Sequence, residues 1–320
     1  MHRQHRWTVR RGQPRAGRDP FERGFAARCL FALVAMLGAA SIGAAPLHLP
    51  ALFEPPTTEH HAGKVVFLEL VTPDLAAAEH FYGGLLGWTF RDVQSGSTSY
   101  AQASLDGHSV AGIIQRPPPA DGHRRPAWLG FIAVGDVDAA EKNALKHGAK
   151  TLFAPHTIPD RGREAVIADP QGAVFAILAS STGDSPDELA APGDWIWSSL
   201  ITSDPDAAAA FYQALFDYDV YELPADEGTR HLMFASGDDA RASANSLPAG
   251  APDAHPHWIS YVRVDDAVAT AARATGLGGH VLVEPRTDRH GGKIAVLADP
   301  QGAVFGLLEW PVGDSKEMSR

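Results

Sequence analysis

One carboxylate stands out among the side chains that could do chemistry. Glu69 lies in the middle of an apolar run from Val65 to Val71. A carboxylate in such a strand is costly unless it is paired or solvated, and a dry site would suit it to general acid or base catalysis. The alternative is a structural role, in which Glu69 meets an arginine or backbone N–H groups at a domain junction. Glu69 is therefore the single weak candidate for a catalytic residue, and whether the protein is an enzyme stays open.

The histidines and the single cysteine form no arrangement typical of a catalytic or metal site. His255 and His257 are two positions apart, His60 and His61 are adjacent, and His231 stands alone on an expected strand. None belongs to an H-x-x-x-H pair. Cys29 is the only cysteine, so the rest of the chain has no disulfides, thiolate ligands or cysteine nucleophile. Nucleophile elbows, phosphate-binding glycine loops and dinucleotide fingerprints are also missing.

The elements that would position these side chains occur twice along the chain. The stretch Ala168 to Phe175 recurs unchanged as Ala298 to Phe305, 130 positions later. Each copy, ADPQGAVF, places Asp-Pro-Gln-Gly between two apolar runs, which predicts a type I turn in a β-hairpin. The offset holds without a gap from Leu70 and Leu200 to Leu178 and Leu308. A gapless period of this length indicates duplicated domains, since it is far longer than a solenoid repeat.

Each copy divides again into two units with the order β-α-β-β-β. In the first copy, a strand from residue 64 leads into a helix over 76–86, and a strand over 128–134 leads into a helix over 138–147. Tyr82 and Tyr212 lie on helix faces beside Phe81 and Phe211 and are expected in the core. We therefore expect domains at 63–180 and 193–312, linkers at 46–62 and 181–192, and a tail at 313–320.

The first 45 residues indicate export. Residues 1–28 hold eight Arg and two acidic residues, and residues 29–45 are apolar or small except for Ser41. This pattern is typical of a secretory signal peptide, with a membrane anchor as the alternative. We expect a periplasmic or secreted protein, or one anchored to the inner membrane by residues 29–45, and no other membrane contact. The net charge of −11 argues against nucleic acid as a partner.

Three motifs together resemble the vicinal oxygen chelate superfamily of glyoxalases, bleomycin resistance proteins and extradiol dioxygenases. They are an opening strand that runs into Thr72-Pro73-Asp74 or Thr202-Ser203-Asp204, the Phe-Tyr pair of the following helix, and the Asp-Pro-Gln-Gly hairpin. The resemblance is to a two-domain glyoxalase-like group. It implies an α+β fold of two tandem domains, each a pair of β-α-β-β-β units forming an open, curved barrel around a cup.

Enzymes of this superfamily hold a divalent metal in the cup, so the ligand positions can be carried over one by one. They hold Phe67, Gly130 and Ala176 in the first domain and Trp197, Ser260 and Gly306 in the second. A divalent ion needs three or four nitrogen or oxygen donors, and Phe, Gly, Ala and Trp have no suitable side-chain donor. A fourth ligand position cannot be aligned. We expect no metal and no other cofactor, with a divalent metal as the alternative.

Strand alternation predicts which other residues face a cup. Large aromatic residues beside small ones would leave a mostly apolar pocket for an organic ligand, although aromatic residues also fill cores. The ligand-binding candidates are Phe67, Glu69, Trp128, Gly130, Ala176, Trp197, Ser199, Trp258, Ser260 and Gly306. Trp195 is expected on the same face as Trp197.

The sequence thus favours a glyoxalase-like, metal-free protein that binds a small, partly apolar organic molecule in a domain cup. One alternative is a metal-dependent lyase or dioxygenase, which would need the missing ligands. The other is a non-catalytic structural or interaction protein, whose cups would be filled. Fold alone does not choose among the three.

Overall fold

A computed structural model describes residues 48–95, 97–117, 126–225, 228–248, 254–287 and 292–310. The expected signal or anchor segment at 29–45 and the tail at 313–320 lie outside these ranges. Within them, no helix is long and apolar enough to cross a membrane.

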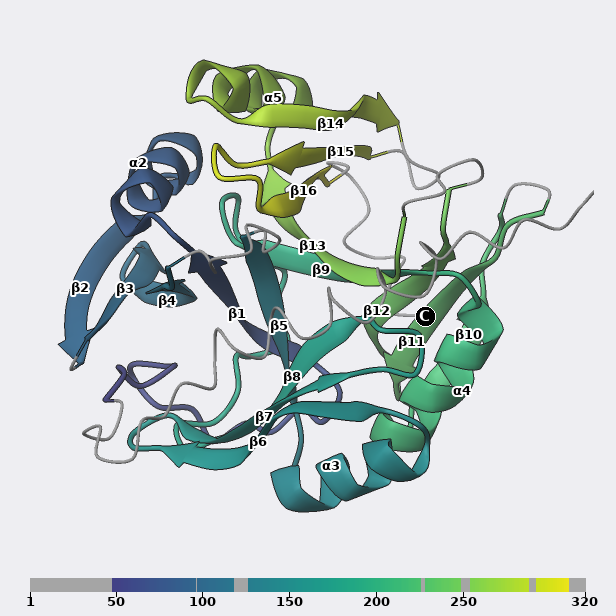
Figure 1. Ribbon diagram of the computed structural model, residues 1–320. Helices are drawn as coiled ribbons and strands as arrows, with labels where there is room; N and C mark the ends of the chain where they lie inside the picture. Colours follow the sequence, from purple (N-terminus) through teal and green to yellow (C-terminus); the bar gives the residue numbers. More distant parts are fainter. Residues whose placement is uncertain are drawn as a thin grey trace, which may run out of the picture.

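The first domain is one eight-stranded sheet, sheet A, with the strand order β2-β3-β4-β1-β5-β8-β7-β6 (Figure 1). Its first unit comprises β1 (Val65–Thr72), α2 (Leu75–Leu86), β2 (Thr89–Ser95), β3 (Thr98–Leu105) and β4 (His108–Gln115). Its second unit comprises β5 (Ala127–Ala133), α3 (Val137–Lys146), β6 (Lys150–Ile158), β7 (Gly162–Ala168) and β8 (Val174–Ser180).

The second domain repeats this arrangement in sheet B, with the order β10-β11-β12-β9-β13-β16-β15-β14. Its first unit comprises β9 (Trp195–Thr202), α4 (Pro205–Phe216), β10 (Asp219–Glu222), β11 (His231–Ser236) and β12 (Asp239–Ser246). Its second unit comprises β13 (His257–Val264), α5 (Ala267–Gly276), β14 (His280–Thr287), β15 (Lys293–Ala298) and β16 (Val304–Glu309).

Local signals in the sequence begin and end these elements. An aspartate caps each of the four helices, and its side chain accepts a hydrogen bond from a backbone N–H in the first turn. The two units of each domain meet at an antiparallel pair of opening strands, β1 with β5 and β9 with β13. The predicted α+β fold of two tandem domains is confirmed, with sheets that are curved but not closed.

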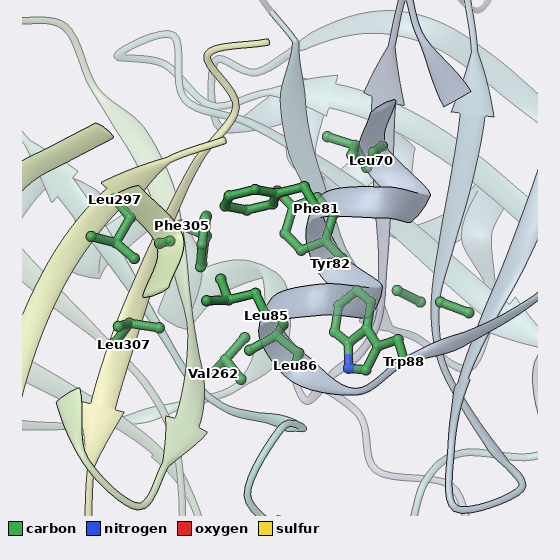
Figure 2. Close-up of a cluster of buried hydrophobic side chains, with 14 of the residues drawn as sticks. Leu70, Phe81, Tyr82, Leu85, Leu86, Trp88, Val262, Leu297, Phe305 and Leu307 are labelled. Carbon is green, nitrogen blue, oxygen red and sulfur yellow. The ribbon is translucent and has the colours of Figure 1, made fainter. Parts of the chain in front are cut away.

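The two domains pack through the helix-bearing faces of their sheets. Figure 1 shows α2 beside α5 and α3 beside α4, so each unit of one domain meets the opposite unit of the other. Figure 2 shows one of the two resulting cores, in which Phe81 and Leu85 of α2 face Phe305 and Leu307 of β16. The second core joins α4 to β8 in the same way, with Phe211 beside Phe175. Neither domain buries this face by itself.

The repeated motifs join the domains through two equivalent hydrogen-bonded chains. Tyr82 donates from its hydroxyl to Oδ2 of Asp299 at 3.2 Å and accepts from Nε1 of Trp128 at 2.9 Å. The equivalent Tyr212 donates to Asp169 and accepts from Trp258, both at 3.1 Å. The other carboxylate oxygen of each Asp accepts two backbone N–H groups of its own turn. The Asp-Pro-Gln-Gly turn of each domain therefore binds the Phe-Tyr helix of the other.

Loss of one tyrosine hydroxyl tests this contact between the domains. Tyr82→Phe leaves Asp299 and Trp128 without a buried partner, so we expect the free energy of unfolding to fall by about 1–3 kcal/mol. Tyr212→Phe should cost a similar amount. Urea unfolding of both variants measures the change, with Tyr221→Phe as the control because Tyr221 is 49% exposed. A Tyr82→Phe variant as stable as the control would contradict this role.

Candidate functional site

Each sheet has a second face that points away from the other domain. Residues paired across neighbouring strands share a face. The pairs Phe67–Phe131 and Phe131–Ala176 mark this face in sheet A, and Trp197–Tyr261 and Tyr261–Gly306 mark it in sheet B. We call these faces cup 1 and cup 2. Phe67, Ala176, Trp197 and Gly306 therefore lie where the sequence places them.

Cup 1 is filled by a segment of the chain that the sequence predicted as linker. Leu49 and Leu52 are 5% and 1% exposed, and they pack against cup residues that include Phe67, Phe131 and Tyr100. Gln102 of β3 holds this segment by donating to the carbonyl of Ala51 at 2.9 Å. The first part of the expected linker at 46–62 thus packs as part of the first domain.

The segment is held in cup 1 by modest forces. Burying two leucine side chains contributes about 3–6 kcal/mol. Because the segment precedes the first strand, β1 and its neighbours can keep their pairing when it leaves.

A buried ionic group lies in the same cup. Arg161, between β6 and β7, is 1% exposed and reaches across to donate to Glu69 at 3.0 Å and to the hydroxyl of Tyr100 at 3.2 Å. Its guanidinium lies 4.9 Å from the ring centroid of Phe67. The prediction that Glu69 could meet an arginine is confirmed, although the contact lies inside cup 1 and not at the domain junction. Glu69 is thus paired and covered.

A second carboxyl group of cup 1 has a strongly shifted pKa. Burial raises the pKa of Glu164 from 4.5 to about 7, and the charge of Arg161 opposes this rise. His156 lies 3.5 Å from Glu164, and burial lowers the pKa of this histidine. Burial also lowers the pKa of Arg161, but Tyr100 and the two carboxylates outweigh it and raise that pKa overall. Arg161 therefore stays charged under the segment.

Four ligand-binding candidates lie on the wrong face. Trp128 and Trp258 bind the interdomain tyrosines, and Ser260 shares a 2.9 Å hydrogen bond with Ser198 on the same face. Gly130 follows Leu129, the cup-side partner of Glu69, and so points away from the cup. The prediction for these four residues was wrong because the sequence of one strand does not determine its register against the next. A shift of one residue in that register moves every side chain of the strand to the other face of the sheet.

Trp195 is also misplaced, for a different reason. Tyr261 pairs with Trp197, but the next residue, Val262, pairs with Trp195, so a bulge interrupts the strand. The bulge turns Trp195 onto the interdomain face, where its ring centroid lies 4.9 Å from that of Trp128.

Cup 2 differs from cup 1 in being free of a hydrophobic cluster. Of the four buried clusters formed by the described residues, two line cup 1 and none lies in cup 2. Pairing across the strands gives four rows of side chains on this face. The first two rows are His231, Asn245, Ile201 and His257, then Met233, Ser243, Ser199 and Ile259. The other two are Trp197, Tyr261, Gly306 and Val296, then Arg263, Leu308, Ile294 and Arg286.

The centre of cup 2 combines two half-buried aromatic rings with a hydroxyl floor. Trp197 donates from Nε1 to Ser243 at 3.1 Å, and the hydroxyls of Ser243 and Ser199 lie 2.8 Å apart. Burial raises the pKa of the Tyr261 hydroxyl, and the neighbouring Ser199 opposes this rise. A Cβ at Gly306 would collide with the Tyr261 ring, so this glycine lets the ring lie flat on the sheet. The indole, the phenol ring and the serines form a surface suited to a flat organic molecule.

The residues present do not fit a divalent metal. Across the ranges that the structure describes, no three His, Cys, Asp or Glu side chains are grouped so as to hold an ion. The observed strand pairing places Phe131, and not Gly130, beside Phe67, and Tyr261, and not Ser260, beside Trp197. Phe131 has no donor atom, and the raised pKa of Tyr261 keeps its phenol neutral.

Sequence reasoning missed Arg161, Glu164, Tyr261, Ser243 and Arg286. A signal was available for two of them. Arg161 and Glu164 are charged residues flanking an apolar strand, as Glu69 is within one. The other three become visible only when strand register is known.

The comparisons with known proteins agree with this architecture. Residues 60–177 match the family model for the Glyoxalase/Bleomycin resistance protein/Dioxygenase superfamily, and residues 198–308 match one for a Glyoxalase-like domain. The Mycobacterium tuberculosis (strain CDC 1551 / Oshkosh) protein named "Putative glyoxylase CFP32" is 35% identical over 257 residues, 80% of this chain and 98% of its own length. The chain belongs to the glyoxalase/bleomycin resistance protein/dioxygenase superfamily.

Other members of the superfamily are similar to the whole two-domain chain. "Anthracycline biosynthesis protein DnrV" of Streptomyces peucetius is 35% identical over 268 residues, 79% of this chain and 95% of its own. The crystal structure of the Mn(II)-bound glyoxalase from Novosphingobium aromaticivorans has a TM-score of 0.56 at 17% identity, covering 78% of this chain and 83% of that one. The crystal structure of the 2,3-dioxygenase LapB from Pseudomonas sp. KL28 has a TM-score of 0.54 at 14% sequence identity, and the match covers 77% of this chain and 92% of that one. These two structures support the fold alone.

The raised pKa of Glu164 predicts a pH dependence of stability. The folded state keeps this proton to about pH 7, whereas the unfolded chain loses it near pH 4.5. Glu164 should therefore lower the free energy of unfolding as pH rises from about 4.5 to 7, by about 3 kcal/mol. Unfolding of the wild type and Glu164→Gln between pH 4 and 8 should show this loss in the wild type and a flatter profile in the variant.

Glu188→Gln is the control for this titration, because Glu188 is exposed. It should keep the wild-type pH profile. A Glu164→Gln profile that also matches the wild type would show that Glu164 titrates normally in the folded protein.

Truncation of a leucine tests the segment in cup 1. Leu52→Ala leaves a cavity between the segment and the sheet, so the segment should bind less tightly. We expect amide hydrogen exchange over residues 49–54 to become at least tenfold faster, with exchange in β1 and β5 unchanged. Leu189→Ala, at a 53% exposed leucine, is the control. Equal acceleration throughout sheet A would mean that the segment cannot leave on its own.

Proposed function

We propose that this protein binds a small, partly apolar organic molecule in cup 2, without a metal ion. The observation that carries the proposal is the contrast between two cups of one duplicated fold. Cup 1 is filled by Leu49 and Leu52, while Trp197 and Tyr261 in cup 2 are only half-buried. Half-buried aromatic rings over a hydroxyl floor are typical of sites for organic ligands.

The chemistry of the site supports binding without a metal. The serine hydroxyls and the indole N–H already bond one another, so a ligand would contact the aromatic faces, and no described donor set competes for a divalent ion. The relatives are named for a glyoxylase and for anthracycline biosynthesis, both of which concern small organic molecules. Export of the protein by its N-terminal segment remains part of the proposal, and would place the binding site outside the cytoplasm.

A matched pair of substitutions tests which cup binds. Thermal-shift screening of the full chain with small aromatic and amphipathic compounds should find a stabilising ligand. Trp197→Leu should weaken that ligand at least tenfold, because the indole forms a wall of cup 2, as measured by titration calorimetry. Phe67→Leu changes the equivalent position of cup 1 and should leave the affinity unchanged.

Two outcomes would contradict the proposal. Weakening by Phe67→Leu and not by Trp197→Leu would place the ligand in cup 1. A stoichiometric divalent metal that survives dialysis, measured by elemental analysis after incubation with Zn²⁺, Ni²⁺, Mn²⁺ and Fe²⁺, would favour the lyase or dioxygenase alternative.

A further inference from the structure

The two cups differ in their charged side chains. Cup 1 contains two buried carboxyl groups, Glu69 and Glu164. At the equivalent positions, 130 residues later, cup 2 has Ser199 and Ile294. None of the sixteen residues in the four rows of cup 2 is Asp or Glu, while the last row contains two arginines. In a chain with a net charge of −11, this is a local reversal of sign.

The two arginines of the last row differ in their hydrogen bonding to the described residues. Arg263 is engaged, because its Nη1 donates to the carbonyl of Ala190 at 2.6 Å. Arg286, on the edge strand β14, makes no hydrogen bond or ion pair with any described residue. Arg286 pairs with Ile294 in the last row, so its side chain starts on the cup side of the sheet, and its charge lowers the pKa of Tyr261 against the effect of burial. Within the described part of the chain, Arg286 is thus a cation without a partner on the side of cup 2.

We propose that the molecule bound in cup 2 is an aromatic carboxylate. This inference rests on the proposed function and names its ligand class. The ring system lies on Trp197 and Tyr261, and the carboxylate binds the guanidinium of Arg286. The planar fork of an arginine matches the two oxygens of a carboxylate, and such charge-assisted pairs are stronger than neutral hydrogen bonds.

The size of the cup limits the ligand. Arg286 lies one row from Tyr261 along the strands and three strands away across the sheet, which places their Cα atoms about 16 Å apart on a flat sheet. The extended arginine side chain and a carboxylate on two fused rings together cover that distance.

Paired probes of the same shape test the charge preference. The full chain is titrated with 2-naphthoate and with neutral 2-naphthamide, following tryptophan fluorescence and heat. We expect the wild type to bind the naphthoate at least tenfold tighter, and this advantage should shrink as salt is raised, since the arginine is exposed. Arg286→Gln should abolish the preference and leave naphthamide affinity unchanged. Arg273→Gln, at an exposed arginine of α5, should behave as the wild type.

The outcomes separate this inference from the proposed function. Equal binding of both probes by the wild type, still weakened by Trp197→Leu, would overturn the charge preference and leave the binding site in cup 2. A preference that persists in Arg286→Gln would overturn the role of this arginine. Binding of neither probe would count against the proposed function as well.

Discussion

The pairing of the domains depends on two equivalent hydrogen bonds, in each of which a tyrosine of one domain donates to an aspartate of the other. Tyr82 of the first domain binds Asp299 of the second, and Tyr212 of the second binds Asp169 of the first. All four groups are buried, so each requires its partner to avoid a lone polar atom in an apolar core. Because each aspartate also fixes its own turn, the contact ties hairpin geometry to domain pairing. The repeated motif is therefore an interdomain joint as well as a turn.

This joint decides which faces remain for binding. Pairing the domains through their helix-bearing faces buries Trp128, Trp258 and the Phe-Tyr helices in two interdomain cores. The opposite faces then point outward as two cups. The contact between the domains needs both copies of the repeat, whereas a ligand needs only one cup. Cup 1 is a packed interior with a buried ion pair, and cup 2 has small residues beside aromatic ones.

The burial of Arg161 shows that cup 1 is an interior and not an open site. A guanidinium that is 1% exposed must be compensated, and Glu69, Tyr100 and the ring of Phe67 surround it. Removing the charge from only one partner would leave the others uncompensated. The residue that looked most like a catalytic base, Glu69, is thus explained by a structural pair inside its own domain. The half-buried rings of cup 2 have no such explanation within the described residues.

The sequence by itself determined the duplication, the order of the elements, the helix caps and the hairpin turns, because these follow from local patterns that repeat at a fixed offset. It also placed Phe67, Ala176, Trp197 and Gly306 correctly, since alternation within one strand is a local property. Only the tertiary structure decided strand register, the bulge at Trp195 and the residues that reach across a cup, such as Arg161. It also decided that residues 49–53 belong to cup 1 and not to a linker. These features depend on contacts between segments far apart in the chain, and a shift of one residue in such a contact exchanges the two faces of a strand.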